Sequence, residues 1–153
     1  MNNNDAKNAK LVRKSIEDVR SVLLGKKIEE LKIAHIISAT NLSRSKFFSF
    51  FGSINIVLEL VISEELISCY ELISQNLSIV KDKDKVLNEL NLQRVIYFRK
   101  NPILFNYYQS ISHLPQRYNP LKEAISVKER DLQISLFEDK GIKIEKVKDL
   151  KIL

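Results

Sequence analysis

The chain has 153 residues, of which 44% are hydrophobic, and a formal net charge of +6 at pH 7. This is enough for one compact domain, or for a small head joined to a helical body. A single cysteine excludes an intrachain disulfide and a thiolate metal cluster. Only three glycines and three prolines are present, so few tight turns are expected and an all-α fold is predicted.

The positive charge is concentrated in the first third of the chain. Residues 1–52 contain ten Lys or Arg and five Asp or Glu, whereas residues 53–153 contain fifteen and fourteen. Such an asymmetry is typical of an N-terminal part that binds nucleic acid or an anionic membrane, and the alternative is a solvated basic surface. The N-terminus does not read as a signal peptide and no apolar window is long enough to span a bilayer, so we expect a cytoplasmic protein without a membrane partner.

The first part of the chain reads as three short helices. Residues 1–9 are polar and are predicted to be a disordered tail. A first helix is expected over residues 10–24, ended by Gly25, and a second around Ile33, Ile36 and Ile37. Thr40-Asn41 supplies a turn, and Ser43 is a natural N-cap for a third helix that carries Phe47, Phe48, Phe50 and Phe51.

The rest of the chain is also predicted to be helical. A long fourth helix is expected from Ser53 to about Leu77, a fifth over residues 84–100, and a sixth from Asn101-Pro102. A seventh is expected over residues 121–138, with Gly141 as its C-cap. Residues 142–153 are predicted to be either a short last helix or an extended tail.

The tetrad Ser43-Arg44-Ser45-Lys46 stands at the start of the third predicted helix. Backbone N–H groups at a helix N-terminus favour phosphate oxygens, and small hydroxylic and basic side chains add donors there. This chemistry indicates DNA binding. The alternative is a capped surface helix that binds nothing.

Residues 10–62 resemble the N-terminal domain of the tetracycline-repressor (TetR) family of transcriptional regulators. The family pattern Ile-Ala-x-x-Ala-Gly-Val-Ser corresponds here to Ile36-Ile37-Ser38-Ala39-Thr40-Asn41-Leu42-Ser43, and its later aromatic positions correspond to Phe48 and Phe51, followed by Ser53-Ile54 and Leu58. Phe48 stands where the family often has a Tyr that contacts phosphate, and Ile54 where it often has Lys. Asn41 replaces the turn Gly, which Asn can do because it tolerates the left-handed conformation.

The resemblance implies a three-helix, helix-turn-helix DNA-binding head over residues 10–52. A long fourth helix would join it to a small helical body, residues 53–153, that dimerises and binds an effector and is short for the family. Arg44 and Lys46 would contact guanine in the major groove, with Ser45 adaptable to several bases. Other residues expected at the DNA are the phosphate-positioning Lys32, Thr40 and Ser43, the packing side chain Phe48, and the outward-facing Ser49.

The body contains a group of aromatic side chains in the region where the family has its effector pocket. Such side chains suit a flat hydrophobic or aromatic ligand. Two alternatives are that they form the core, which is commoner for aromatics at helical spacing, or a dimer seam. The candidate pocket residues are Tyr97, Phe98, Phe105, Tyr107, Tyr108 and His113.

We therefore expect a sequence-specific transcriptional regulator that binds a palindromic DNA operator as a homodimer, a repressor released by a small-molecule effector. The alternatives are a helical protein-interaction module with a basic head, and a DNA-binding regulator without an effector. The two histidines form no catalytic ordering, and the sequence contains no Gly-rich phosphate loop and no metal-ligand spacing. We accordingly expect no enzyme activity, metal or cofactor. The operator, the effector and the sign of regulation do not follow from the sequence.

Overall fold

The computed structural model describes residues 3–143, and all regular secondary structure in that range is helical, which confirms the predicted all-α class. A short 3-10 turn precedes the predicted second helix. In chain order the elements are α1 Asn3–Gly25, η1 Ile28–Glu30, α2 Ile33–Thr40, α3 Arg44–Phe51, α4 Ile54–Asn76, α5 Lys83–Lys100, α6 Pro102–Ser110, η2 Ile111–His113, η3 Gln116–Tyr118 and α7 Asn119–Asp139.

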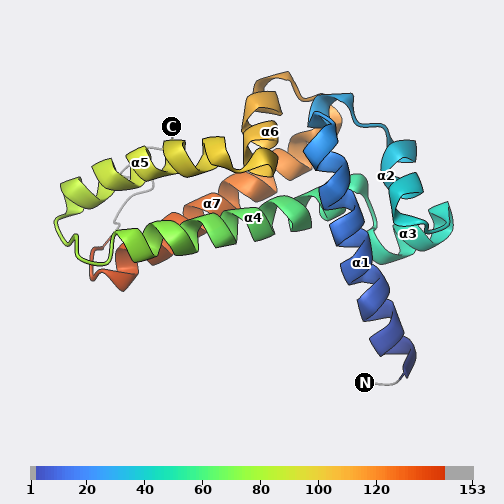
Figure 1. Ribbon diagram of the computed structural model, residues 1–153, viewed down its shortest axis with the longest axis horizontal. Coiled ribbons are helices and arrows are strands. Elements are labelled where there is room, and N and C mark those ends of the chain that lie inside the picture. The colour runs from blue at the N-terminus through green and yellow to red at the C-terminus, as the bar shows by residue number, and fades with distance from the viewer. Residues whose placement is uncertain (1–2, 144–153) are drawn as a thin grey trace.

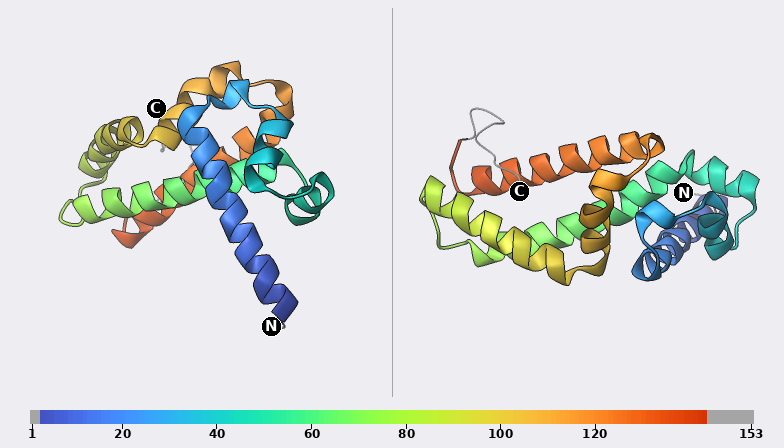
Figure 2. Two further views of the ribbon diagram at one scale, coloured as in Figure 1. Left: turned by 45° about the vertical axis from the view of Figure 1, so that its right-hand side comes forward. Right: turned by 90° about the horizontal axis from the view of Figure 1, so that it is seen from above.

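The prediction of a disordered N-terminal tail is wrong for residues 3–9, which form the first two turns of α1. These residues are exposed, and Figures 1 and 2 show this end of α1 projecting away from the rest of the molecule. Once the buried part of α1 has formed, residues 3–9 can extend it without the unfavourable free energy of starting a new helix. Asp5 in the first turn also favours the positive end of the helix dipole.

Side-chain caps begin four of the helices. The side chains of Ser43, Ser53, Asp82 and Asn101 accept hydrogen bonds from backbone N–H groups in the first turns of α3, α4, α5 and α6. Each such cap satisfies a donor that the helix itself cannot. The predicted starts of these helices agree with the structure to within two residues. Helix α7 begins two residues earlier than predicted, and residues 144–153 lie outside the described range.

Helix α4 is the central element of the fold. Figures 1 and 2 show α4 running along the length of the body, with α7 beside it on one side and α5 on the other. Helix α6 crosses from the end of α5 toward the start of α7, and α1, α2 and α3 lie at one end of α4. Most of the apolar residues of α4 are buried, and Cys69 is buried with them, which raises the pKa of its thiol to about 11. Within residues 3–143 no single helix is both long and apolar enough to cross a membrane. Helices α3 and α4 meet that test only as a pair bent by 58°.

A buried ion pair lies at the centre of the body. Arg94 of α5 and Glu129 of α7 are 5% and 2% exposed, and the guanidinium donates through Nε and Nη2 to the two carboxylate oxygens at 2.7 and 2.8 Å. The hydroxyls of Tyr70 and Tyr108 donate to the same carboxylate, and the Gln133 amide donates to the Tyr70 hydroxyl at 2.9 Å. Burial and the nearby carboxylate raise the pKa of both tyrosines. One charged pair therefore joins α4, α5, α6 and α7.

A second charged network connects α1 to α4. Arg13 donates to Glu64 at 2.6 and 2.9 Å, and Arg20 donates to Glu64 at 2.7 Å and to Glu65 at 3.0 Å; both arginines also pair with Glu17. The pKa of Glu64 is lowered to about 2, chiefly by the hydrogen bond from Arg13. Burial raises this pKa by a smaller amount, and the hydrogen bond from Arg20 lowers it further. This network joins α1 to the helix that runs through the body.

Replacing Glu129 with Gln is expected to lower the free energy of unfolding by about 3–5 kcal/mol, because Arg94 is left buried without its counter-charge. Chemical denaturation followed by circular dichroism measures the change. The matched control is Glu123→Gln, which makes the same chemical change at an exposed position of α7. The double variant Arg94→Met/Glu129→Leu should recover most of the loss, and equal losses for Glu129→Gln and Glu123→Gln would contradict the role of the pair.

The Glu64 network predicts a pH-dependent stability. Because the folded pKa of about 2 lies below the ordinary value of 4.5, the contribution of Glu64 is present above pH 4.5 and is lost as the pH falls toward 2. The change in Tm over this interval should be smaller in Glu64→Gln than in the parent, and Glu71→Gln on the same helix should behave like the parent. Since Glu64 is partly exposed, added salt should reduce the difference.

Candidate nucleic-acid interface

Helices α2 and α3 are joined by a tight turn of three residues. Asn41 ends α2 in the left-handed conformation, with φ 58° and ψ 14°, as the sequence predicts for the position of the turn. Its N–H donates to the Ser38 carbonyl at 3.4 Å. Asn is one of the few residues other than Gly that adopts this conformation readily. The turn therefore sets the angle at which the chain enters α3.

Thr40 does not have the predicted role of a phosphate contact. It is 4% exposed, its hydroxyl donates to the Ile37 carbonyl at 2.7 Å, and the same oxygen accepts from the Leu42 N–H at 3.3 Å. A threonine at the end of a short helix can bond to nearby backbone groups in this way. Thr40 stabilises the turn from inside and is closed to solvent.

Ser43 is the N-cap of α3, as predicted. Its hydroxyl accepts a hydrogen bond from the Lys46 N–H at 3.1 Å. The backbone of Ser43 is extended, and Arg44 is the first residue of the helix. The side chains of Arg44, Ser45 and Lys46 thus occupy the first turn, where the helix dipole is positive.

Helix α3 has one buried face and one exposed face. Phe47 and Phe51, four residues apart, are 0% and 4% exposed, with ring centroids 5.1 Å apart. Their burial against the core directs the opposite face outward. The side chains on the exposed face are Arg44, Ser45, Lys46 and Ser49.

Two of the phenylalanines on α3 support cations. The Arg44 guanidinium carbon lies 5.3 Å from the centroid of the half-buried Phe48 ring, and the Lys46 ammonium lies 5.8 Å from the centroid of Phe50. Cations over aromatic faces at such distances are held by the ring quadrupole. Phe48 therefore orients Arg44 and packs against Phe47, so the ring has a local role without the hydroxyl of a tyrosine.

Within the described residues, some cations of the N-terminal part are paired with carboxylates, and those around α2 and α3 are not. Arg13 and Arg20 are engaged by the glutamates of α1 and α4, and Lys14 pairs with Asp18 at 3.1 Å. By contrast, Lys32, Arg44 and Lys46 are exposed and form no ion pair with any residue in the range 3–143. Lys32 immediately precedes α2, next to the same surface in the chain. These three cations are available to an anionic partner.

The six predicted effector residues do not line one cavity. Tyr107 and Phe98 are 0% and 6% exposed and belong to the core, and Tyr108 is half-buried with its ring 5.0 Å from the Arg94 guanidinium carbon. The hydroxyl of the half-buried Tyr97 accepts from the Asn76 amide at 2.7 Å. For these four residues the alternative of core packing describes the structure. Phe105 and His113 are exposed and line a pocket elsewhere.

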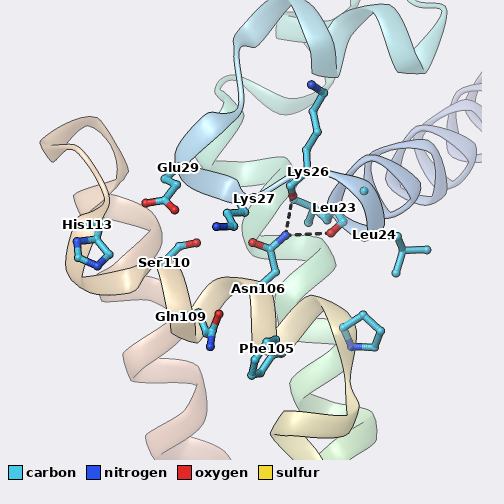
Figure 3. Close-up of a pocket in the computed structure, with 12 residues that line it drawn as sticks. Leu23, Leu24, Lys26, Lys27, Glu29, Phe105, Asn106, Gln109, Ser110 and His113 are labelled. Atoms are coloured by element: carbon cyan, nitrogen blue, oxygen red, sulfur yellow. Dashed lines mark hydrogen bonds between the residues drawn. The ribbon is translucent and has the colours of Figure 1, made fainter.

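That pocket lies where α1 and η1 meet α6, and its centre is Asn106, a residue that the sequence analysis missed (Figure 3). The Asn106 amide nitrogen donates to the carbonyls of Leu23 and Lys26 at 2.9 and 2.7 Å, and its oxygen accepts from the Ile28 N–H at 3.1 Å. One side chain of α6 thus caps the end of α1 and holds the start of η1. A single Asn in an apolar helix carries no sequence pattern that would have revealed this contact.

The comparisons with protein-family models, with curated proteins and with solved structures gave no match. The basis for a function is therefore the geometry of the chain itself. Within residues 3–143, no group of three or more His, Cys, Asp or Glu side chains is placed to hold a metal ion.

Replacing Ser43 with Ala should lower the free energy of unfolding by about 1 kcal/mol, because the Lys46 N–H loses its acceptor. The matched control is Ser45→Ala, which removes the same atoms two residues later, where the side chain is exposed and caps nothing. Urea denaturation of the two variants measures the difference. Equal stabilities would show that the Ser43 cap does not contribute.

Proposed function

We propose that the protein is a sequence-specific DNA-binding transcriptional regulator and that α2, the turn and α3 form a helix-turn-helix unit. The observation that carries the proposal is the exposed first turn of α3. It presents Arg44, Ser45 and Lys46 from a capped helix whose other face is anchored by Phe47 and Phe51. A rigid helix with basic side chains at its N-terminus suits entry into a major groove. The resemblance of residues 10–62 to the TetR family supports the same function.

In this proposal the residues have different tasks. Arg44 and Lys46 donate to guanine O6 and N7, and Ser45 and Ser49 make adaptable contacts with neighbouring bases. Lys32 contacts a phosphate. The unpartnered N–H groups at the start of α3 bind another phosphate, while Ser43 fixes the helix end. The cation-π contact with Phe48 limits the freedom of Arg44 and so reduces the entropy lost on binding.

We also propose that two copies bind a palindromic site, with one α3 in each of two successive major grooves. Helices α4 and α5 leave large apolar side chains exposed, Leu72 at 48% and Leu92 at 54% among them, which a second copy would cover. A small molecule that prefers one arrangement of the two heads would change the affinity for DNA. The alternative, a protein-interaction module with a basic head, draws on the same exposed cations.

The test is selection of duplexes from a randomised DNA pool, followed by fluorescence anisotropy with the selected duplex and a scrambled one. The variant Arg44→Ala/Lys46→Ala should bind the selected duplex at least about tenfold more weakly, since each base contact contributes about 1–3 kcal/mol of discrimination. Lys83→Ala/Lys85→Ala is the matched control, because it removes the same number of exposed positive charges from the body. It should bind like the parent.

Three further readings separate the alternatives. Lys32→Ala should weaken the selected and the scrambled duplex alike and reduce the slope of log K against log salt by about 1. Sedimentation should show two chains on each palindromic duplex. Selection that enriches no sequence, together with weak and steeply salt-dependent binding of every duplex, would favour the protein-interaction module and reject sequence-specific regulation.

A further inference from the structure

The pocket at the junction of α1, η1 and α6 has a volume of about 440 Å³ and is partly open to solvent. Volumes of this size are typical of small-molecule sites. It is separate from the aromatic centre of the body, where Arg94 and Glu129 occupy the space between the helices. It is also separate from the exposed face of α3, since no residue of α2 or α3 lines it.

One end of the pocket is apolar. Leu24 and Phe105 are 60% and 41% exposed, and Pro102 lines the same pocket. Figure 3 shows Leu24 on the α1 side and Phe105 on the α6 side, with the Asn106 clamp beyond them. Covering exposed apolar side chains with another apolar group removes their surface from water, which lowers the free energy of the complex. This end is suited to a ring or a short hydrocarbon chain.

The other end of the pocket is polar. In Figure 3 the side chains of Lys27, Glu29, Ser110 and His113 lie together on the side away from Leu24. The Lys27 ammonium is turned toward this end and forms no ion pair with any residue in the described range, whereas the neighbouring Lys26 extends its ammonium away from the pocket. The unpaired Lys27 ammonium favours a carboxylate, and Ser110 and His113 offer hydrogen-bond donors beside it. The Glu29 carboxylate repels an anion, so the ligand's carboxylate would bind on the Lys27 side of this end.

The backbone at this end of the pocket does not oppose an anion as strongly as a helix C-terminus ordinarily would. The last carbonyls of a helix carry partial negative charge. Here the carbonyl of Leu23, in the last turn of α1, and the carbonyl of Lys26, just after the helix, already accept hydrogen bonds from the Asn106 amide, which reduces the negative potential that they present to the pocket. The side chain of Asn106 therefore separates the ligand site from the negative end of α1.

We propose that this pocket binds a small amphipathic carboxylate, with its carboxylate on Lys27 and its apolar part against Leu24 and Phe105. The bound molecule lies on both α1 and α6 and touches Asn106, which joins them. If α3 binds DNA as proposed above, on which this regulatory step rests, the carboxylate changes DNA affinity by favouring one position of α1 relative to α6.

The first experiment measures binding without DNA, so that it is independent of the proposed function. Sodium benzoate is titrated into the full chain and followed by saturation-transfer NMR and by the Asn106 side-chain amide signals, with benzamide and benzylamine as the neutral and cationic probes. Benzoate should saturate the site and bind about tenfold more tightly than benzamide. Lys27→Met should remove this preference, and Gln109→Glu, which adds a negative charge at an exposed lining position, should weaken benzoate by a similar factor.

Lys26→Met is the matched control. It removes the same charge at the neighbouring residue, whose side chain points out of the pocket. It should retain the affinity for benzoate to within about twofold. The proposal is overturned if benzoate fails to saturate, if benzylamine or benzamide binds as well as benzoate, or if Lys26→Met and Lys27→Met lose the same affinity.

The second experiment repeats the DNA titration with saturating benzoate. We expect the affinity of the parent for its selected duplex to change by about fivefold or more and that of Lys27→Met to stay constant. Benzoate binding with unchanged DNA affinity would reject the regulatory step. A chain that selects no DNA sequence but binds benzoate through Lys27 would reject the proposed function and keep the site.

Discussion

The buried pair of Arg94 and Glu129 is the constraint on which the arrangement of the body depends. A bidentate contact between two side chains that are almost fully enclosed requires α5 and α7 to lie in one register, and the hydroxyls of Tyr70 and Tyr108 extend that requirement to α4 and α6. A hydrophobic core tolerates small shifts between helices more readily than a buried charge does. The same cluster fills the region between the aromatic rings, and the pocket that Asn106 borders lies elsewhere, at the junction with α1.

Helix starts were the most predictable part of the fold, because their chemistry is local. Ser43, Ser53 and the Asn101-Pro102 pair each place a cap beside the first turn that needs it. The buried ion pair left a signal that was not used: Arg94 follows Val86 and Leu90 at intervals of four, and Glu129 follows Leu121 and Ile125 in the same way. Opposite charges at core positions of two helices indicate a buried pair, although which helices meet depends on tertiary packing.

The candidate site was predictable where a single helix determines it. The i, i+4 pair Phe47 and Phe51 fixes the buried face of α3, so the exposure of Arg44, Ser45, Lys46 and Ser49 follows from spacing alone. The prediction that Thr40 contacts a phosphate does not fit the structure, because its hydroxyl is hydrogen-bonded to backbone groups of its own turn. The predicted effector residues do not share one cavity, since only Phe105 and His113 line the pocket at the junction of α1, η1 and α6. This division, like the position of Asn106, depends on which elements from distant parts of the chain face each other.

The charged network between α1 and α4 has an effect beyond holding the two helices together. By engaging Arg13 and Arg20, the glutamates of α1 and α4 remove much of their field from the surroundings, while Lys32, Arg44 and Lys46 keep theirs. Positive potential is therefore reduced on the side of α1 that faces α4 and retained at the start of α3. For the DNA partner proposed above, such an uneven charge distribution would produce a torque that disfavours approach to the α4 side of α1 before any specific contact forms.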